Sequence, residues 1–241
     1  MRKICFYFRA AFHLLYTVLL MPKVKRAKKR SYEEGEELIH KYVKNWARAT
    51  MKATGLNIKV QGKEKIPEGP CLYIANHQSI IDIPLLIDVV DGKLGAVAKK
   101  ELENVPILSY WCRAIHCVFM DRNNIREGLK SIQQATENLK NGSSMLIFPE
   151  GTRSKGGKMK DFKKGSLKMA MKANVPIIPV TIEGTYKICE GYDKWDKKDN
   201  DCICIIHDPI YPKDLTREEQ QGLSEKCKEI IEKSLDNLNK K

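Results

Sequence analysis

The sequence has few aromatic residues: phenylalanine, tryptophan and tyrosine make up 7% of its 241 residues. They are not interleaved with lysine and arginine in the pattern that stacks single-stranded bases. The chain nevertheless carries a formal net charge of +13, and such an excess favours an anionic partner. We therefore expect an anionic membrane surface or a phosphorylated substrate, and no nucleic acid.

The cysteines lack the spacing of a disulfide framework. There are 8 of them, mostly inside apolar runs, which is typical of reduced, buried thiols in a protein that faces the cytosol. Cys202, Cys204 and His207 lie close together in sequence, but no second pair of ligands accompanies them. We therefore expect no metal site, and no cofactor.

The sequence also lacks an internal repeat and any second globular unit, so a single domain is expected. The apolar run at residues 4–21 has no small-x-small cleavage site after it, which argues against a cleaved signal peptide. Arg9, His13 and Thr17 recur every four residues here and form one polar stripe on a helix. The run is at the short limit of a membrane span, and the stripe suits an interfacial helix at least as well. Pro22 is expected to end this helix.

Lysine and arginine dominate residues 23–30, which follow the apolar run directly. Such a cluster binds anionic headgroups and holds its flank on the cytoplasmic side of a membrane. The alternative is a solvated linker. Residues 31–52 predict a second helix, capped by Ser31 and ended by Gly55, which can pack on the first as an anchoring hairpin. We therefore place the chain at the cytoplasmic face of the cell membrane, held by a monotopic or single N-terminal anchor.

Beyond residue 54, apolar strand patterns alternate with helical ones. Strands are predicted at residues 56–61, 71–75, 94–98, 114–120, 143–148, 175–182 and 203–206, the last at an edge of the sheet. Helices are predicted at residues 85–90, 101–113, 123–140, 162–173 and 216–238. Such alternation predicts an α/β domain over residues 55–241, with a largely parallel or mixed sheet flanked by helices.

A polar turn at residues 76–84 joins the predicted strand at 71–75 to the helix that follows it. The turn contains Asn76, His77 and Asp82. A neutral imidazole can remove a proton near pH 7, and a carboxylate can orient it and stabilise the cation that forms. This pattern predicts a general-base pair. The alternative is that Ser79 or Asp82 caps the helix and His77 is a surface loop residue.

A second apolar run ends in a polar turn at Glu150, Gly151, Thr152 and Arg153. Glycine allows a tight backbone, and arginine can hold an anion with two hydrogen bonds. The two turns, in this order, resemble the His-x4-Asp and Glu-Gly-Thr-Arg boxes of the glycerophospholipid acyltransferase family, of the bacterial 1-acylglycerol-3-phosphate acyltransferase type. Residues 118–122 and 175–180 resemble two further blocks of that family. Met120 and Ala114 depart from its usual residues, and neither is a proposed catalytic group.

Cationic residues also follow other predicted strands, namely Lys100, Arg122 and Arg153. If these strands lie side by side with their ends together, a base and several cations gather at one sheet edge. A base beside a cationic cluster suits a substrate that carries both a hydroxyl and a phosphate. The family resemblance implies the same pair of substrates, lysophosphatidate and an acyl thioester, and a two-helix membrane-docking element over residues 1–54.

The resemblance implies acyl transfer from acyl-CoA or acyl-carrier protein to the sn-2 hydroxyl of 1-acylglycerol-3-phosphate, which gives phosphatidic acid. His77 would be the base, with Asp82 orienting it, while Arg153, Arg122 and Lys100 hold the phosphate. Glu150, with Gly151 and Thr152, is expected to order the turn or the glycerol, and Asn76 to bond backbone. The residues leave two alternatives open: another acceptor, such as glycerol-3-phosphate or a different lysophospholipid, and a basic membrane-binding module without catalysis.

Overall fold

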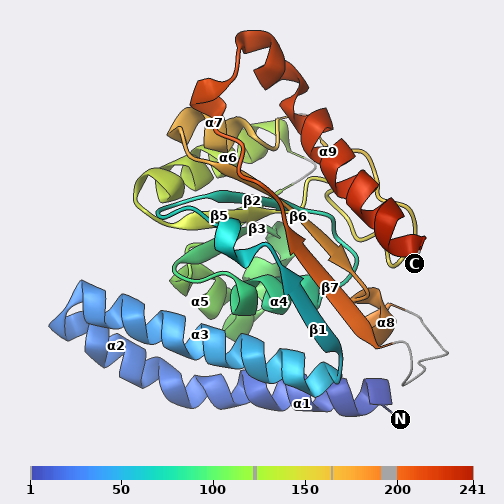
Figure 1. The fold of residues 1–241 in the computed structure, drawn as a ribbon. Coiled ribbons are helices and arrows are strands. Elements are labelled where there is room, and N and C mark those ends of the chain that lie inside the picture. The colour runs from blue at the N-terminus through green and yellow to red at the C-terminus, as the bar shows by residue number, and fades with distance from the viewer. Residues whose placement is uncertain (1, 122–123, 164, 191–199, 241) are drawn as a thin grey trace.

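The computed structural model describes residues 2–121, 124–163, 165–190 and 200–240. Its centre is a seven-stranded sheet in the order β1-β7-β6-β2-β5-β3-β4 (Figure 1). β6 and β7 are antiparallel, and the other neighbouring strands are parallel. The strands are β1 (Asn57–Gln61), β2 (Leu72–Ala75), β3 (Leu94–Lys99), β4 (Val118–Met120), β5 (Ser144–Ile147), β6 (Ile177–Glu183) and β7 (Asp201–Ile206). The expected α/β architecture with a largely parallel sheet is confirmed.

Both faces of this sheet are covered, so its central strands are apolar at nearly every position. β2 and β5 are buried throughout. On one face, α4 (Asp82–Val89) packs with side chains from the N-terminal helices, and α5 (Pro106–Ala114) lies beside them. The other face is covered by α6 (Ile125–Lys140), α7 (Lys168–Ala173) and α9 (Arg217–Asn239) (Figure 1).

The N-terminal element contains more helix than expected. It comprises α1 (Arg2–Tyr16), a 3-10 turn (Thr17–Leu20), α2 (Met21–Arg30) and α3 (Tyr32–Thr54). The expectation that Pro22 ends the first helix is wrong, because Pro22 lies in the first turn of α2, where a helix needs no backbone N–H. The expected basic linker is likewise a helix. Of the described residues, no helix is long and apolar enough to cross a bilayer.

The second predicted helix begins and ends where its signals indicate. Ser31 accepts a hydrogen bond from the Glu34 backbone N–H at 3.4 Å and so caps α3. Gly55 ends α3 with a φ of 69°, a left-handed conformation that glycine adopts without strain. α3 packs against α4, so the N-terminal helices lie directly on the sheet-covering layer.

Three other expectations need correction. β7 lies between β6 and β1 rather than at an edge. β4 is shorter than the predicted strand at 114–120, because α5 continues to Ala114 and a turn follows. Only the second half of the helix expected at 162–173 is α-helical, and a short helix, α8 (Tyr186–Cys189), follows β6 without having been predicted.

Candidate active site

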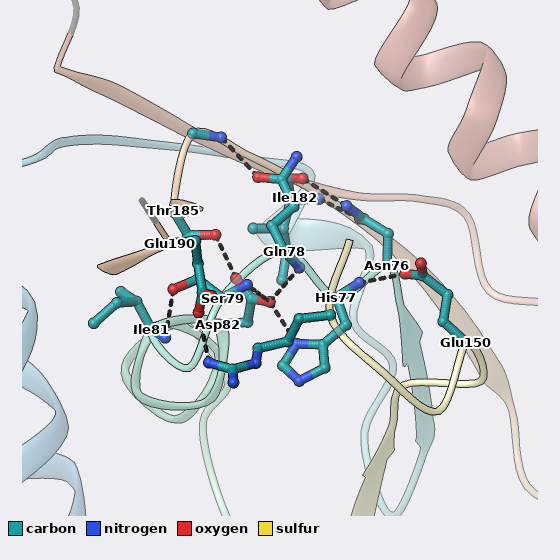
Figure 2. A network of polar contacts seen from close by, with 12 residues as sticks. Asn76, His77, Gln78, Ser79, Ile81, Asp82, Glu150, Ile182, Thr185 and Glu190 are labelled. Carbon is teal, nitrogen blue, oxygen red and sulfur yellow. Dashed lines mark hydrogen bonds and ion pairs between the residues drawn. The ribbon is translucent and has the colours of Figure 1, made fainter. Parts of the chain in front are cut away.

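The carboxyl ends of β2, β5 and β6 meet at one edge of the sheet. β2 pairs in parallel with both β5 and β6, so the polar residues that follow these strands converge. His77 follows β2, Glu150 follows β5 and Thr185 follows β6. Figure 2 shows Glu150 approaching His77 from one side and Asp82 from the other.

His77 and Asp82 form a hydrogen-bonded pair. The distance from His77 Nδ1 to Asp82 Oδ2 is 2.7 Å, and the Asp82 side chain is fully buried, whereas 15% of the His77 side chain is exposed. An ionised carboxylate can only accept, so Nδ1 carries the hydrogen of this bond. Nε2 then holds the free lone pair and can accept a proton from a substrate.

The Asp82 carboxylate is held by three further donors. Oδ2 accepts the backbone N–H groups of Gln78 at 2.7 Å and Ser79 at 2.9 Å. Oδ1 accepts the hydroxyl hydrogen of Thr185 (Figure 2). Because a buried polar group is costly unless hydrogen bonds compensate it, these three donors hold the carboxylate in one orientation.

Glu150 joins the second polar turn to the first. Its Oε1 accepts the His77 backbone N–H at 2.6 Å, and its Oε2 accepts the Lys160 backbone N–H at 2.9 Å. Burial raises the pKa of Glu150, and the two backbone donors oppose that rise. The Phe148 ring lies flat against the imidazole, with ring centroids 4.0 Å apart and planes at 15°. Glu150 and Phe148 therefore set the backbone and the ring plane of His77.

Two side chains tie the first turn to β6. The Asn76 amide donates to the Ile182 carbonyl at 2.8 Å and accepts the Ile182 N–H at 2.8 Å. The Gln78 amide donates to Glu183 at 2.7 Å and accepts the Gly184 N–H at 3.0 Å. These four hydrogen bonds hold the first turn against β6 and the residue that follows it.

Arg153 lies on the second turn and pairs with Glu190. Its Nη1 is 2.5 Å from Glu190 Oε1, and the two side chains are 36% and 6% exposed respectively. Gly151 has a φ of 70°, a left-handed conformation that glycine adopts without strain. Thr152 is exposed on this turn. The Ser154 N–H donates to the His77 carbonyl at 2.7 Å, which brings the Arg153 segment against the turn that carries His77.

The other two predicted phosphate ligands are placed differently. Lys100 follows β3 at the same sheet edge, but its Nζ pairs with Glu103 at 2.5 Å, and 55% of its side chain is exposed. The Glu103 carboxylate raises the pKa of Lys100. Arg122 lies outside the described residues. The structure therefore brings His77, Asp82, Asn76, Glu150 and Arg153 together, with Lys100 further along the edge.

Sequence reasoning missed Thr185, Gln78 and Glu190. Thr185 comes soon after a predicted strand, as His77 does, and this position was the available signal. Gln78 lies inside the recognised turn but carries no motif of its own. Glu190 follows α8, a helix of only four residues that no periodicity could reveal.

Comparisons with known proteins agree on one family. A family model described as Acyltransferase matches residues 57–183. The 1-acyl-sn-glycerol-3-phosphate acyltransferase of Haemophilus influenzae is 31% identical over 170 residues, which are 69% of this chain and 69% of that protein. The protein of the same name from Saccharomyces cerevisiae is 32% identical over 179 residues, which are 73% of this chain and 58% of that protein. The chloroplastic relative from Brassica napus is 34% identical over 63% of this chain, and the match covers 44% of that protein. The chain therefore spans only about half the length of several curated relatives.

A solved structure resembles the whole chain. It is the 1-acyl-sn-glycerophosphate acyltransferase PlsC of Thermotoga maritima, with a TM-score of 0.83 and 30% sequence identity. The match covers 100% of this chain and 95% of that one. The likeness therefore includes the N-terminal helices as well as the sheet.

Proposed function

Because the chain belongs to the 1-acyl-sn-glycerol-3-phosphate acyltransferase family, we propose that it acylates the sn-2 hydroxyl of 1-acylglycerol-3-phosphate. The acyl donor is acyl-CoA or acyl-carrier protein, and the product is phosphatidic acid for phospholipid synthesis. The observation that carries this proposal is the 2.7 Å contact between His77 Nδ1 and Asp82 Oδ2, which leaves Nε2 as the base.

The reaction is a direct acyl transfer. His77 Nε2 takes the proton of the sn-2 hydroxyl while the hydroxyl oxygen attacks the thioester carbonyl carbon. The C–S bond then breaks, the acyl group stays on the new ester oxygen, and the leaving thiolate takes the proton from His77. Asp82 stabilises the imidazolium that exists between these two proton transfers.

No covalent acyl-enzyme is required by this scheme. Ser79 is the nearest hydroxyl in sequence, but it is fully buried, and its Oγ accepts the Ile81 backbone N–H at 3.4 Å at the start of α4. Such a hydroxyl supports the turn and is not open to a thioester. We therefore assign Ser79 a structural role.

Arg153 is the principal phosphate ligand in this proposal. A guanidinium presents several N–H donors in one plane, which suits phosphate. Lys100 adds positive charge along the same edge, and Arg122, which comes two residues after β4 in sequence, stays a predicted phosphate ligand. Holding the phosphate places the sn-2 hydroxyl beside His77, and this positioning supplies much of the rate enhancement. Glu150, Gly151, Thr152 and Asn76 shape the turns that carry these groups.

The N-terminal helices provide the membrane-docking surface, over residues 1–54. α1 and the following turn expose large apolar side chains: Tyr7, Phe8, Phe12, Leu15, Tyr16, Val18 and Leu19. The exposed lysines and arginines of α2 follow directly. An apolar stripe in the interface and cations at the headgroups together give stable attachment. We therefore propose docking of α1 in the interface of an anionic membrane, at its cytoplasmic face.

Thiol release from palmitoyl-CoA by the purified protein in detergent tests the reaction. We expect release that requires both 1-acylglycerol-3-phosphate and His77, so that the His77→Ala variant is about 10²- to 10⁴-fold slower. Acyl-carrier protein is the second donor to be assayed, and glycerol-3-phosphate and other lysophospholipids are the acceptors for comparison. Release without any acceptor would indicate a thioesterase, and no release across the panel would leave a membrane-binding module.

A further inference from the structure

The short segment after β6 reaches both halves of the site. Its Thr185 donates a hydrogen bond to Asp82, and its Glu190 pairs with Arg153 (Figure 2). Building on the proposed function, we infer that Glu190 is a positioning residue that fixes the Arg153 guanidinium in the orientation that receives the lysolipid phosphate. Glu190 does not touch the substrate in this account. It acts through Arg153.

The contact between the two side chains has the geometry that this role needs. Glu190 Oε1 lies 2.5 Å from Arg153 Nη1. The carboxylate is 6% exposed and the arginine side chain 36% exposed, so Glu190 holds Arg153 from the protein side. A guanidinium carries five N–H donors in one rigid plane. The contact with Glu190 through one donor restrains the guanidinium and leaves its other donors for an anion.

The pair also lies on the side where a membrane lipid would arrive. The Tyr7 side chain of α1 lies within interaction range of Cys189, the residue before Glu190. Burial raises the pKa of Tyr7 to about 12, and Cys189 and the Glu190 carboxylate contribute to the rise. Figure 1 shows α8 near the N-terminal end of α1. The proposed phosphate ligand is thus adjacent to the proposed membrane-docking helix.

Charge alone would argue against a carboxylate at this position. A negative group beside Arg153 reduces the attraction for a phosphate. The benefit of Glu190 is therefore orientation, which a neutral side chain of the same shape can also supply. Glutamine keeps an oxygen that accepts from Nη1, whereas alanine does not, so the two substitutions separate orientation from charge.

Steady-state kinetics with lysophosphatidate in mixed micelles test this inference. We expect Glu190→Ala to raise the KM for lysophosphatidate about tenfold, the effect of one charge-assisted hydrogen bond, with kcat and the KM for the acyl donor little changed. Glu190→Gln is expected to recover most of that loss. An unchanged KM in Glu190→Ala, or a Glu190→Gln variant as impaired as Glu190→Ala, would overturn the inference.

A double-mutant cycle excludes a general packing effect. In an Arg153→Ala background, Glu190→Ala should add no further rise in KM, because its partner is gone. An additive rise would contradict the positioning role. Asp88→Ala is the matched control, since it removes another Arg–carboxylate pair, with Arg48 Nε 3.2 Å from Asp88 Oδ1, between α3 and α4. It should leave the KM for lysophosphatidate unchanged.

Direct binding separates this inference from the proposed function. Equilibrium binding of lysophosphatidate, with lysophosphatidylcholine as the comparison, is measured in mixed micelles on the His77→Ala variant with and without Glu190→Ala. Weaker lysophosphatidate binding in the double variant supports the inference, even if the wild-type protein transfers no acyl chain. Equal binding by both proteins overturns it, even if the wild-type protein is an active acyltransferase.

Discussion

Glu150 accepts the backbone N–H of His77 at 2.6 Å, across 73 residues of sequence. The two polar turns recognised in the sequence are therefore one unit, in which the second holds the first. A carboxylate at this place offers two acceptors to two N–H donors, those of His77 and Lys160. We therefore expect Glu150 to order the two turns rather than to exchange protons with a substrate.

Glu150→Gln should lower both stability and activity. The amide has one acceptor, so one buried backbone donor would face an NH₂ group, at a cost of about 1–3 kcal/mol. Chemical denaturation measures the loss, and Glu137→Gln, at an exposed ion pair on α6, is the control. Stability as great as that of the wild type would contradict this account.

The pH dependence of Glu150 has a definite sign. Its pKa is raised in the folded protein, so the folded state binds the proton more tightly. The contribution of Glu150 to stability is complete below its unfolded pKa and is lost as the pH rises through the folded value. The stability difference between the wild type and Glu150→Gln should therefore change between pH 4 and neutral pH, in favour of the variant as the pH rises.

We expect the Thr185 hydroxyl to be needed for activity, because it donates a hydrogen bond to the second carboxylate oxygen of Asp82. Thr185→Val keeps the shape but leaves Oδ1 without its hydroxyl donor, so we expect kcat to fall about tenfold, with destabilisation of about 1–3 kcal/mol. Thr185→Ser retains the hydroxyl and should restore most of kcat. A Thr185→Ser variant as impaired as Thr185→Val would contradict this account, because serine keeps the hydroxyl that donates to Oδ1.

Arg153 and Lys100 should contribute unequally to acceptor binding. The residue after Arg153 is hydrogen-bonded to the His77 carbonyl, whereas Lys100 is largely exposed and paired with Glu103. We expect Arg153→Ala to raise the KM for lysophosphatidate by about tenfold or more, and Lys100→Ala by about two- to threefold, since exposed charges act weakly. An effect of Arg153→Ala confined to the acyl donor would instead place this residue at the thioester site.

The strand, turn and helix around His77 could be predicted because three independent signals coincide there. An apolar run, a polar turn and a second apolar run correspond to β2, the turn that carries His77, and α4. The order of the strands could not be predicted in the same way. Alternation of strands and helices indicates a parallel sheet, but only tertiary packing turns β7 antiparallel to β6 and brings β1 to the edge.

The partners of the site residues were the hardest to foresee. Thr185 is 103 residues from Asp82, and Glu190 is 37 residues from Arg153. No local sequence pattern can indicate a contact between residues so far apart in the sequence. The wrong prediction that Pro22 ends the first helix had a different cause. A proline after an apolar run can mark either the end of one helix or the start of the next. Pro22 does the latter.

Acid should destabilise the fold through three half-buried histidines. Burial is the main reason why the pKa values of His40, His116 and His207 are lowered. Their neutral forms are favoured in the folded protein, so their contribution is complete above pH about 6.5 and is lost as the pH falls through the folded values. Denaturation at pH 7.5, 6.5 and 5.5 measures the slope, and His207→Gln should reduce it. If the free energy of unfolding falls with pH as steeply in His207→Gln as in the wild type, His207 does not contribute to the acid sensitivity.

Membrane attachment should depend on apolar side chains of the α1 region that contribute nothing to the core. Phe12 and Leu19 are 62% and 68% exposed, so replacing both with serine should leave the free energy of unfolding in detergent nearly unchanged. Each apolar side chain buried in the interface stabilises binding by about 1.5–3 kcal/mol, so the double variant should bind anionic vesicles at least about tenfold more weakly. Leu129→Ser is the matched control, because Leu129 is 61% exposed on α6, over the opposite face of the sheet.

High salt provides the second half of this test. The cations of α2 attract anionic headgroups over about 10 Å at moderate ionic strength, so salt should weaken vesicle binding in the wild type and in the Phe12→Ser/Leu19→Ser variant alike. The weakening of vesicle binding caused by the two serine substitutions and the weakening caused by salt should then add. If Leu129→Ser reduces vesicle binding as much as the α1 variant does, the effect is a general loss of surface hydrophobicity, and α1 is not the docking surface.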